Sequence, residues 1–176
     1  MGLKGSYLEA GLRLVLIYGS LNIAFAIVVP LLAHLLFPQP FVFVQEDEVF
    51  TGVSWDLILA LSQKLGLWLL FQMDTARGMM LGLGIMTVAV ALKGLKKGET
   101  WALASIFLSG VAGGVPFWTF TALYFQKGLY EGTSGVSLGI WLTLIFYLPW
   151  AGGLVLSGIG IRERKKAGPA APTASA

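Results

Sequence analysis

Three of the few ionisable side chains in this sequence stand at the ends of long apolar runs. His34 lies near the end of the first run, and Asp74 and Arg77 directly precede the second. Asp74 and Arg77 are three residues apart, so they are neighbours on one face if the segment is helical. A guanidinium group suits a carboxylate or a phosphate, and a histidine changes charge near neutral pH. These residue types indicate a site for an anionic or amphipathic ligand.

Two aromatic residues complete this candidate ligand site. Trp118 and Tyr124 lie toward the end of a later apolar run, and we expect the topology to bring them to the depth of His34. Structural roles stay open for the same residues. Asp74 and Arg77 also suit an ion pair that anchors a helix end, while histidine and tryptophan are common at the membrane–water interface.

The sequence offers little material for catalysis or metal binding. It has one histidine, nine acidic residues and no cysteine, which excludes disulfides and Cys-ligated metal centres. It contains neither a His/Glu pair at metal-ligand spacing nor a glycine-rich phosphate loop between a strand and a helix. We therefore expect no catalytic residue, no metal and no cofactor, and the sequence favours a non-enzymatic function.

Composition places the chain in a membrane. Of its 176 residues 56% are hydrophobic and only 12% are charged, whereas a soluble domain carries about 25% charged residues. A helix crosses a bilayer core in roughly 20 residues, and four apolar runs are long enough, at residues 14–37, 76–95, 101–125 and 138–161. The sequence predicts an all-α integral membrane protein, in which residues 1–166 form one bundle of four transmembrane helices.

The first run also has some features of a cleaved leader. Ala24-Phe25-Ala26 has the small-x-small form of a cleavage site. The apolar run continues well past Ala26, however, and is longer than the core of an ordinary signal peptide. We expect the first helix to be retained.

Residues 54–73 are apolar enough to be tested as a fifth span. Lys64 would then lie at the middle of the membrane, at a cost of about 2.5–3.5 kcal/mol. A fifth span would also place the basic turn Lys93–Lys97 outside the cell, against the positive-inside rule. We predict instead an interfacial amphipathic helix in the first outer loop, capped by Ser54, and a re-entrant segment stays open.

Basic residues set the orientation. With four spans, cytoplasmic segments hold nine Lys and Arg residues and outer segments hold three. Both termini are then cytoplasmic, the membrane is the plasma (inner) membrane, and the Pro/Ala-rich residues 167–176 form a disordered cytoplasmic tail.

Small residues are expected to pack the helices, because in lipid close backbone approach supplies the attraction between them. Asn22 is expected to bond to a neighbouring helix. The small residues at helical spacing are Gly78, Gly82, Ser105, Ser109, Gly113, Gly139, Gly153 and Ser157.

Two short stretches carry a resemblance. Arg77-Gly78 begins one run, and Lys97-Gly98-Glu99-Thr100-Trp101-Ala102 begins the next. In this respect Asp74–Phe125 resembles many small four-helix bacterial inner-membrane proteins, which are largely uncharacterised. The resemblance implies the bundle and its orientation and carries no activity.

Two classes of function follow. The first is a structural or accessory protein in the lipid bilayer, for example a subunit of a larger assembly with a membrane-protein partner or a second copy of the chain. The alternative is a binder or carrier of an apolar or amphipathic small molecule, such as a lipid, with its pocket in the outer half of the bundle. The net charge of +3 is too small to indicate nucleic acid. A small-residue face left exposed would favour the first class, and a cavity among His34, Asp74, Arg77 and aromatic residues would favour the second.

Overall fold

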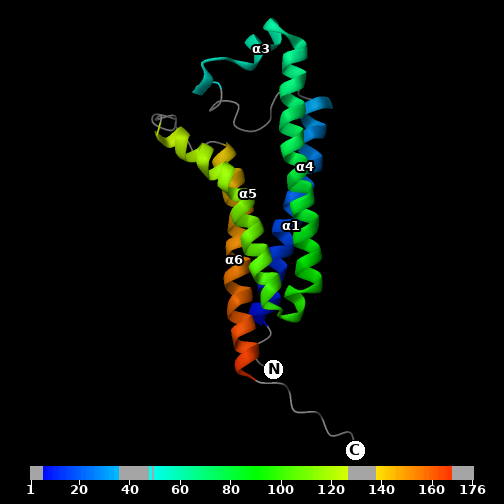
Figure 1. Cartoon of the computed structure of the whole chain (residues 1–176), viewed down its shortest axis with the longest axis vertical. Helices are drawn as coiled ribbons and strands as arrows, with labels where there is room; N and C mark the ends of the chain where they lie inside the picture. Colours follow the sequence, from blue (N-terminus) through cyan, green and yellow to red (C-terminus); the bar gives the residue numbers. More distant parts are fainter. Residues whose placement is uncertain (1–5, 36–47, 49, 127–137, 168–176) are drawn as a thin grey trace, which may run out of the picture.

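The computed structural model describes residues 6–35, 48, 50–126 and 138–167. Within these ranges the chain is helical apart from short turns and contains no strand, so the predicted all-helical class is confirmed. The elements are α1 (Ser6–Leu35), α3 (Trp55–Leu61), α4 (Gln63–Lys93), the short 3₁₀ turn η2 (Leu95–Lys97), α5 (Thr100–Gln126) and α6 (Leu138–Lys166) (Figure 1).

Several of these helices have the length and composition of membrane spans. Three described stretches are long and apolar enough to cross a bilayer, namely Tyr7–Leu35, Gln63–Lys97 and Leu144–Lys166, and Thr100–Val115 is a shorter apolar helix. Large apolar side chains are exposed on their outer surfaces, as at Leu31, Met79, Leu108 and Leu148. Lipid solvates such a surface, whereas in water it would be an aggregation hazard.

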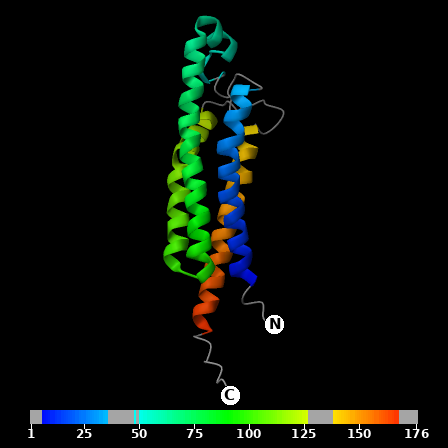
Figure 2. The same ribbon diagram turned by 90° about the vertical axis from the view of Figure 1, so that its right-hand side faces the viewer.

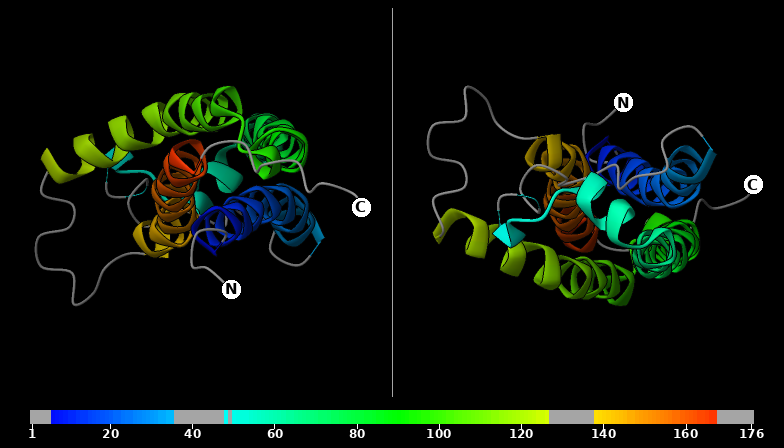
Figure 3. Two further views of the ribbon diagram at one scale, coloured as in Figure 1. Left: turned by 90° about the horizontal axis from the view of Figure 1, so that it is seen from below. Right: turned by 90° about the horizontal axis from the view of Figure 1, so that it is seen from above.

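Helix α1 is the centre of the bundle. It packs along both α4 and α6, whereas α5 makes sparser contacts with α4 and α6. The helices run nearly parallel to one long axis (Figures 1 and 2). Toward its second half, α5 leans away from α4, which is evident both from the side and along the axis (Figures 1 and 3).

The buried positions of α1 and α4 recur every seven residues. This period keeps one seam of each helix against its neighbour when two helices cross at a small angle. On α1 the buried series is Leu8, Val15, Asn22 and Val29, and on α4 it is Leu70, Arg77, Gly84 and Ala91.

Glycines allow the close approach along these seams. A Cβ added at Gly84 would lie 2.7 Å from the carbonyl oxygen of Gly19, and one at Gly160 would lie 2.5 Å from the backbone nitrogen of Leu8. Atoms with side chains between them could not come so near, so the backbones of α1, α4 and α6 touch at these points.

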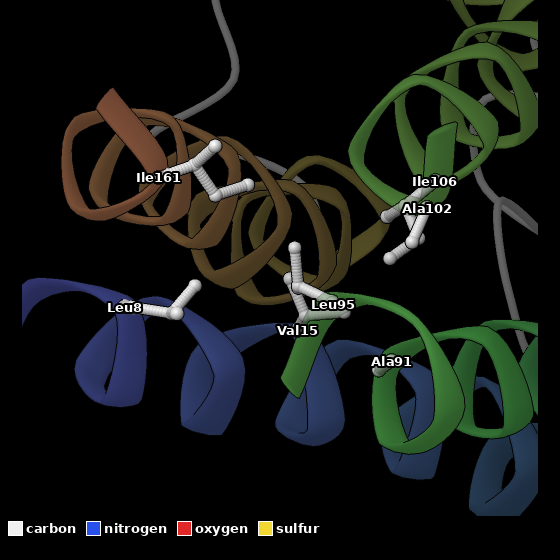
Figure 4. Close-up of a cluster of buried hydrophobic side chains, with 7 residues drawn as sticks. All are labelled: Leu8, Val15, Ala91, Leu95, Ala102, Ile106 and Ile161. Atoms are coloured by element: carbon white, nitrogen blue, oxygen red, sulfur yellow. The ribbon is translucent and has the colours of Figure 1, made fainter. Parts of the chain in front are cut away.

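One end of the bundle is closed by an apolar cluster beneath the basic turn. Its buried members come from all four long helices and from η2, and they are Leu8, Val15, Ala91, Leu95, Ala102, Ile106 and Ile161 (Figure 4). The turn itself ends at Gly98, whose φ of +82° suits glycine. Arg164 fixes the turn to α6, because its Nη1 donates to the carbonyl oxygen of Lys97 at 2.9 Å.

The prediction of a separate helix over residues 54–73 is wrong in its second half. Ser54 caps a helix as expected, since its Oγ accepts from the amide of Leu57 at 3.2 Å, but this helix, α3, ends at Leu61. The next one, α4, starts at Gln63 and continues without a break to Lys93.

Two local features explain this boundary. Ser62 is extended, with φ −165° and ψ 115°, and its Oγ caps α4 by accepting from the amide of Leu65. The segment Asp74–Arg77, where we expected the break, contains neither Gly nor Pro. Its Asp74 and Arg77 side chains pair one turn apart, which supports a continuous helix.

The remaining expectations concern the tail, the last predicted loop and Asn22. Residues 168–176 of the expected tail lie outside the described residues, as does Glu131 in the last predicted loop. Asn22 does not bond to a neighbouring helix as we expected, because its Nδ2 donates to the carbonyl oxygen of Tyr18 in the same helix at 2.9 Å.

Candidate functional site

The three ionisable residues singled out from the sequence meet at one end of the α1–α4 seam. His34 Nε2 lies 2.5 Å from Oδ2 of Asp74, and Arg77 Nη1 donates to Oδ1 of Asp74 at 2.6 Å. A carboxylate only accepts hydrogen bonds, so in this contact Nε2 of His34 carries the hydrogen. Asp74 therefore bridges a histidine of α1 and an arginine of α4, with one oxygen for each.

Burial within this cluster is uneven. The side chain of Arg77 is 9% exposed, that of Asp74 21% and that of His34 29%. The guanidinium thus lies inside the seam, while the imidazole lies nearer its edge and 5.7 Å from the ring of Phe71, measured between centroids. A buried cation keeps its charge at low cost only beside an anion, and Asp74 supplies it.

The helices place these groups at the end of the seam by simple periodicity. Arg77 occupies the buried seven-residue series of α4, between Leu70 and Gly84. Asp74 lies one turn before it, on the side toward the end of α1. Just beyond, Ala33, Trp55 and Leu70 form a buried cluster in which α3 folds back over the end of the seam.

The chemistry available to this cluster is limited. Within the described residues there is no group of three His, Asp or Glu side chains that could hold a metal ion. Among the described residues, the carboxylate of Asp74 pairs with His34 and Arg77, and no serine, threonine or tyrosine hydroxyl is hydrogen-bonded to it. The arrangement suits a hydrogen-bonded tie between two helices.

Trp118 is not part of this cluster. It lies on the second half of α5, and its ring centroid is 5.4 Å from that of Tyr147 on α6. It lines a cavity of about 540 Å³ between α5 and α6. Tyr124 lies in α5, but its side chain is not among those that the structure describes. The candidate ligand residues whose side chains are described are thus divided: His34, Asp74 and Arg77 lie in the α1–α4 seam, and Trp118 lies in the α5–α6 cavity, because α5 leans away from α4 (Figure 3).

Two of the expected packing residues face α1 from α6. A Cβ at Gly153 would lie 2.8 Å from Cγ2 of Val15, and Ser157 is fully buried against Gly11. Gly113 faces Leu83 of α4, with 3.2 Å between its added Cβ and Cδ2 of that residue.

The other expected packing residues lie elsewhere. Gly78 and Gly82 have no atom of another element within 4 Å, and Ser105 is exposed. The Oγ of Ser109 donates to Ile106 within its own helix. Gly139 lies in α6, and its burial is not described by the structure.

Sequence reasoning missed three glycines that carry close helix contacts. Gly11, Gly19 and Gly84 are buried between helices, and each would collide with a neighbour if it carried a Cβ. A signal was present for Gly84, since it lies seven residues after Arg77 and continues its series. The α6 residues of the α5–α6 cavity, Tyr147 and Trp150, were also missed, because aromatic residues are common at the membrane interface.

Comparison with known proteins gave no match: no family model, no curated protein and no solved structure is significantly similar to this chain. The function must therefore be argued from the geometry itself.

Proposed function

We propose that this chain is a structural or accessory protein of the plasma (inner) membrane, that it spans the membrane four times with both termini in the cytoplasm, and that it binds another membrane-protein helix through one face of α4. This face, the α4 glycine face, consists of Phe71, Gly78, Gly82 and Ile85.

The membrane placement is supported by the exposed apolar surface and by the basic residues. Lys93, Lys96 and Lys97 lie at one end of the bundle, and the hydrogen bond from Arg164 to Lys97 brings the basic end of α6 to the same place. Positive side chains gathered at one end of a membrane bundle favour the cytoplasmic side for that end. The opposite end, with His34 and Asp74, would then face outward.

The observation that carries the partner proposal is the exposure of Gly78 and Gly82. At every other helical glycine whose surroundings the structure describes, an added Cβ would have a neighbour within 4 Å, so glycine there makes room for other atoms. Gly78 and Gly82 have none, and each costs a helix up to about 1 kcal/mol relative to alanine. Such a cost is offset when a second helix approaches the backbone closely, as small-xxx-small pairs allow.

The surroundings of the two glycines fit this role. Phe71, Gly78 and Ile85 are seven residues apart and are all exposed. Each lies one residue, or about 100° of helix rotation, after a buried residue of the α1 seam. Phe71 is at the edge of that seam, with 5.7 Å between its ring centroid and that of His34. The face therefore consists of a shallow notch between two large apolar side chains, which is the shape that receives a helix crossing at a small angle.

Native mass spectrometry after gentle extraction tests this proposal. We expect a complex with a second protein, or with a second copy, in the unaltered chain and its loss in Gly78→Leu and Gly82→Leu. Ala104→Leu is the matched control, because Ala104 is an exposed small residue on α5 outside this face. Association that survives both glycine substitutions, or a chain that is alone before any substitution, would contradict the proposal.

A second candidate function, the binding of an apolar or amphipathic molecule, is favoured by the cavity between α5 and α6. It is the cavity, and not the cluster around Asp74, that offers space for a ligand.

A further inference from the structure

The cavity between α5 and α6 is a groove with one helix as its wall and aromatic rings as its floor. From α5 it is lined by two adjacent series at four-residue spacing, and from α6 by two aromatic residues. The first series is Gly110, Trp118, Ala122 and Gln126, the second is Val111, Val115, Thr119 and Leu123, and the α6 residues are Tyr147 and Trp150.

Glycines on α5 fix the lower end of this groove. Gly110 lies directly against the indole of Trp150, and a Cβ at Gly114 would come 2.6 Å from the hydroxyl oxygen of Tyr147. Nε1 of Trp150 also donates to the carbonyl oxygen of Ile106 at 3.1 Å. The two helices are therefore held together here, and the groove opens above this point, where α5 and α6 diverge (Figure 1).

Three of the lining rings follow one another along the groove, and a fourth ring, that of Phe107, stacks on Trp150 outside the lining. The centroids of Phe107 and Trp150 are 6.1 Å apart, those of Trp150 and Tyr147 are 5.8 Å apart, and those of Tyr147 and Trp118 are 5.4 Å apart. These are ordinary separations for interacting aromatic pairs, so the rings support one another. The floor is thus a continuous apolar strip that is preformed without a ligand.

The groove is apolar along most of its length and polar at one end. Its lining residues carry no charge, and the hydroxyl of Thr119 is already bonded to the carbonyl oxygen of Val115. At the far end Gln126 adds an exposed amide as the last residue of α5. A ligand would therefore meet hydrocarbon-like walls over most of its length and a polar group at one end, as an amphiphile requires.

The volume of the groove limits which kind of molecule fits. It is about 540 Å³, which is in the range of pockets for small molecules, roughly 300–1,000 Å³. A helix about 10 Å across fills on the order of 1,200 Å³ over ten residues. The groove therefore suits a slender apolar chain better than a partner helix.

We propose that the α5–α6 groove binds one acyl chain of a diacyl glycerolipid from the leaflet on the side of Gln126. The chain lies along the rings from Trp118 toward Trp150, and the glycerol ester region lies near the Gln126 amide. Unfilled space at this depth would forfeit van der Waals contacts on both walls, so a chain from the surrounding bilayer enters it. The inference rests on the membrane placement proposed above and does not depend on the α4 glycine face.

The test uses the full-length protein in phosphatidylcholine vesicles that contain a small fraction of phosphatidylcholine with a photoreactive diazirine in one acyl chain. After illumination, adducts are mapped by mass spectrometry. We expect groove residues such as Val115 and Leu123 to be labelled several-fold more than Met79 and Met86, which are exposed on α4. Excess unlabelled lipid should leave this ratio unchanged while lowering both signals.

Substitutions that fill the groove sharpen the test. We expect Ala122→Trp to lower groove labelling by about tenfold, the change that displacing roughly two buried methylene groups produces. Val115→Phe should act in the same direction, which guards against a folding defect in one variant. Ala104→Trp is the control, since Ala104 is exposed on α5 outside the groove, and it should change nothing.

Three results would overturn the inference. They are uniform labelling of groove and lipid-facing residues, groove labelling that Ala122→Trp and Val115→Phe leave unchanged, and crosslinks from the groove to another polypeptide in native membranes. Partner binding through the α4 glycine face is measured separately by native mass spectrometry. If groove labelling fails while partner binding persists, the acyl-chain inference has failed. If partner binding fails while groove labelling persists, the α4 glycine face proposal has failed.

Discussion

His34 and Asp74, forty residues apart in the sequence, meet at 2.5 Å and join the end of α1 to the middle of α4. The same two helices touch backbone to backbone at Gly19 and Gly84. Near the basic turn they share the apolar cluster that includes Val15 and Ala91. The seam is therefore fixed at three heights by three different kinds of interaction, and the polar one lies at the end of α1.

The first prediction concerns the ion pair within this tie. Asp74→Ala leaves the buried guanidinium of Arg77 without its anion, and we expect the free energy of unfolding to fall by about 2–4 kcal/mol. Replacing both partners, as Asp74→Ala with Arg77→Leu, should recover more than half of that loss, because no buried charge remains unpaired. Unfolding in mixed micelles, followed by circular dichroism, measures both changes.

The chain contains its own control for this prediction. Glu9 and Arg13 form an ion pair at 2.6 Å whose side chains are 62% and 74% exposed. Arg13→Ala should therefore change stability by less than about 1 kcal/mol. A double variant no more stable than Asp74→Ala alone would show that Arg77 does not depend on Asp74 for its charge.

The second prediction separates buried from exposed glycines on α4. Gly84→Ala places a Cβ 2.7 Å from the carbonyl oxygen of Gly19, so α1 and α4 must move apart, and we expect a loss of about 1–3 kcal/mol. Gly78→Ala meets nothing within 4 Å and should stabilise the isolated chain by up to about 1 kcal/mol through helix propensity. Thermal unfolding of the two variants in the same detergent gives the comparison, and equal effects would contradict the packing seen at Gly84.

The difference between these glycines shows where sequence reasoning stops. Apolar runs free of charge predicted the helices, because hydrocarbon leaves the backbone no other way to satisfy its hydrogen bonds. Spacing alone also predicted that Asp74 and Arg77 would pair. Four-residue spacing singled out Gly78 and Gly82 and passed over Gly84, which is buried because α1 crosses α4 at that position.

The groove and the helix boundary were missed for similar reasons. The direction in which α5 leaves α4 depends on Trp150 and Tyr147 fitting over Gly110 and Gly114, a contact between helices that no local pattern reveals. The break at Ser62 depends on one capping side chain, whereas the charged segment Asp74–Arg77 seemed a better end for a helix. The charge pattern therefore predicted the wrong place for this helix end.

The third prediction tests the orientation. The chain has no cysteine, so single cysteines can be introduced without background. We expect Asp56→Cys to react with a membrane-impermeant maleimide on intact cells, and Lys97→Cys to react only after the cells are opened, because the basic turn should be cytoplasmic. Both positions are exposed in the structure, so neither is shielded by the fold. Labelling of Lys97→Cys from outside would reverse the proposed topology.

The last prediction decides how the first part of α4 is placed. In the structure residues 63–73 continue α4, with Gly66 and Leu70 buried and with Leu67 and Phe71 exposed. Spin labels placed singly from Gln63 to Arg77 in bilayer vesicles should therefore show one helical period without a change of phase at Asp74–Arg77. Their depth should change steadily, by about 1.5 Å per residue along an upright helix. A helix lying in the interface would instead keep all labels before Asp74 at one depth and shift phase after it. That result would mean that α4 bends at Asp74 in the bilayer, and the tie between His34 and Asp74 would then lie at a hinge and not within a straight helix.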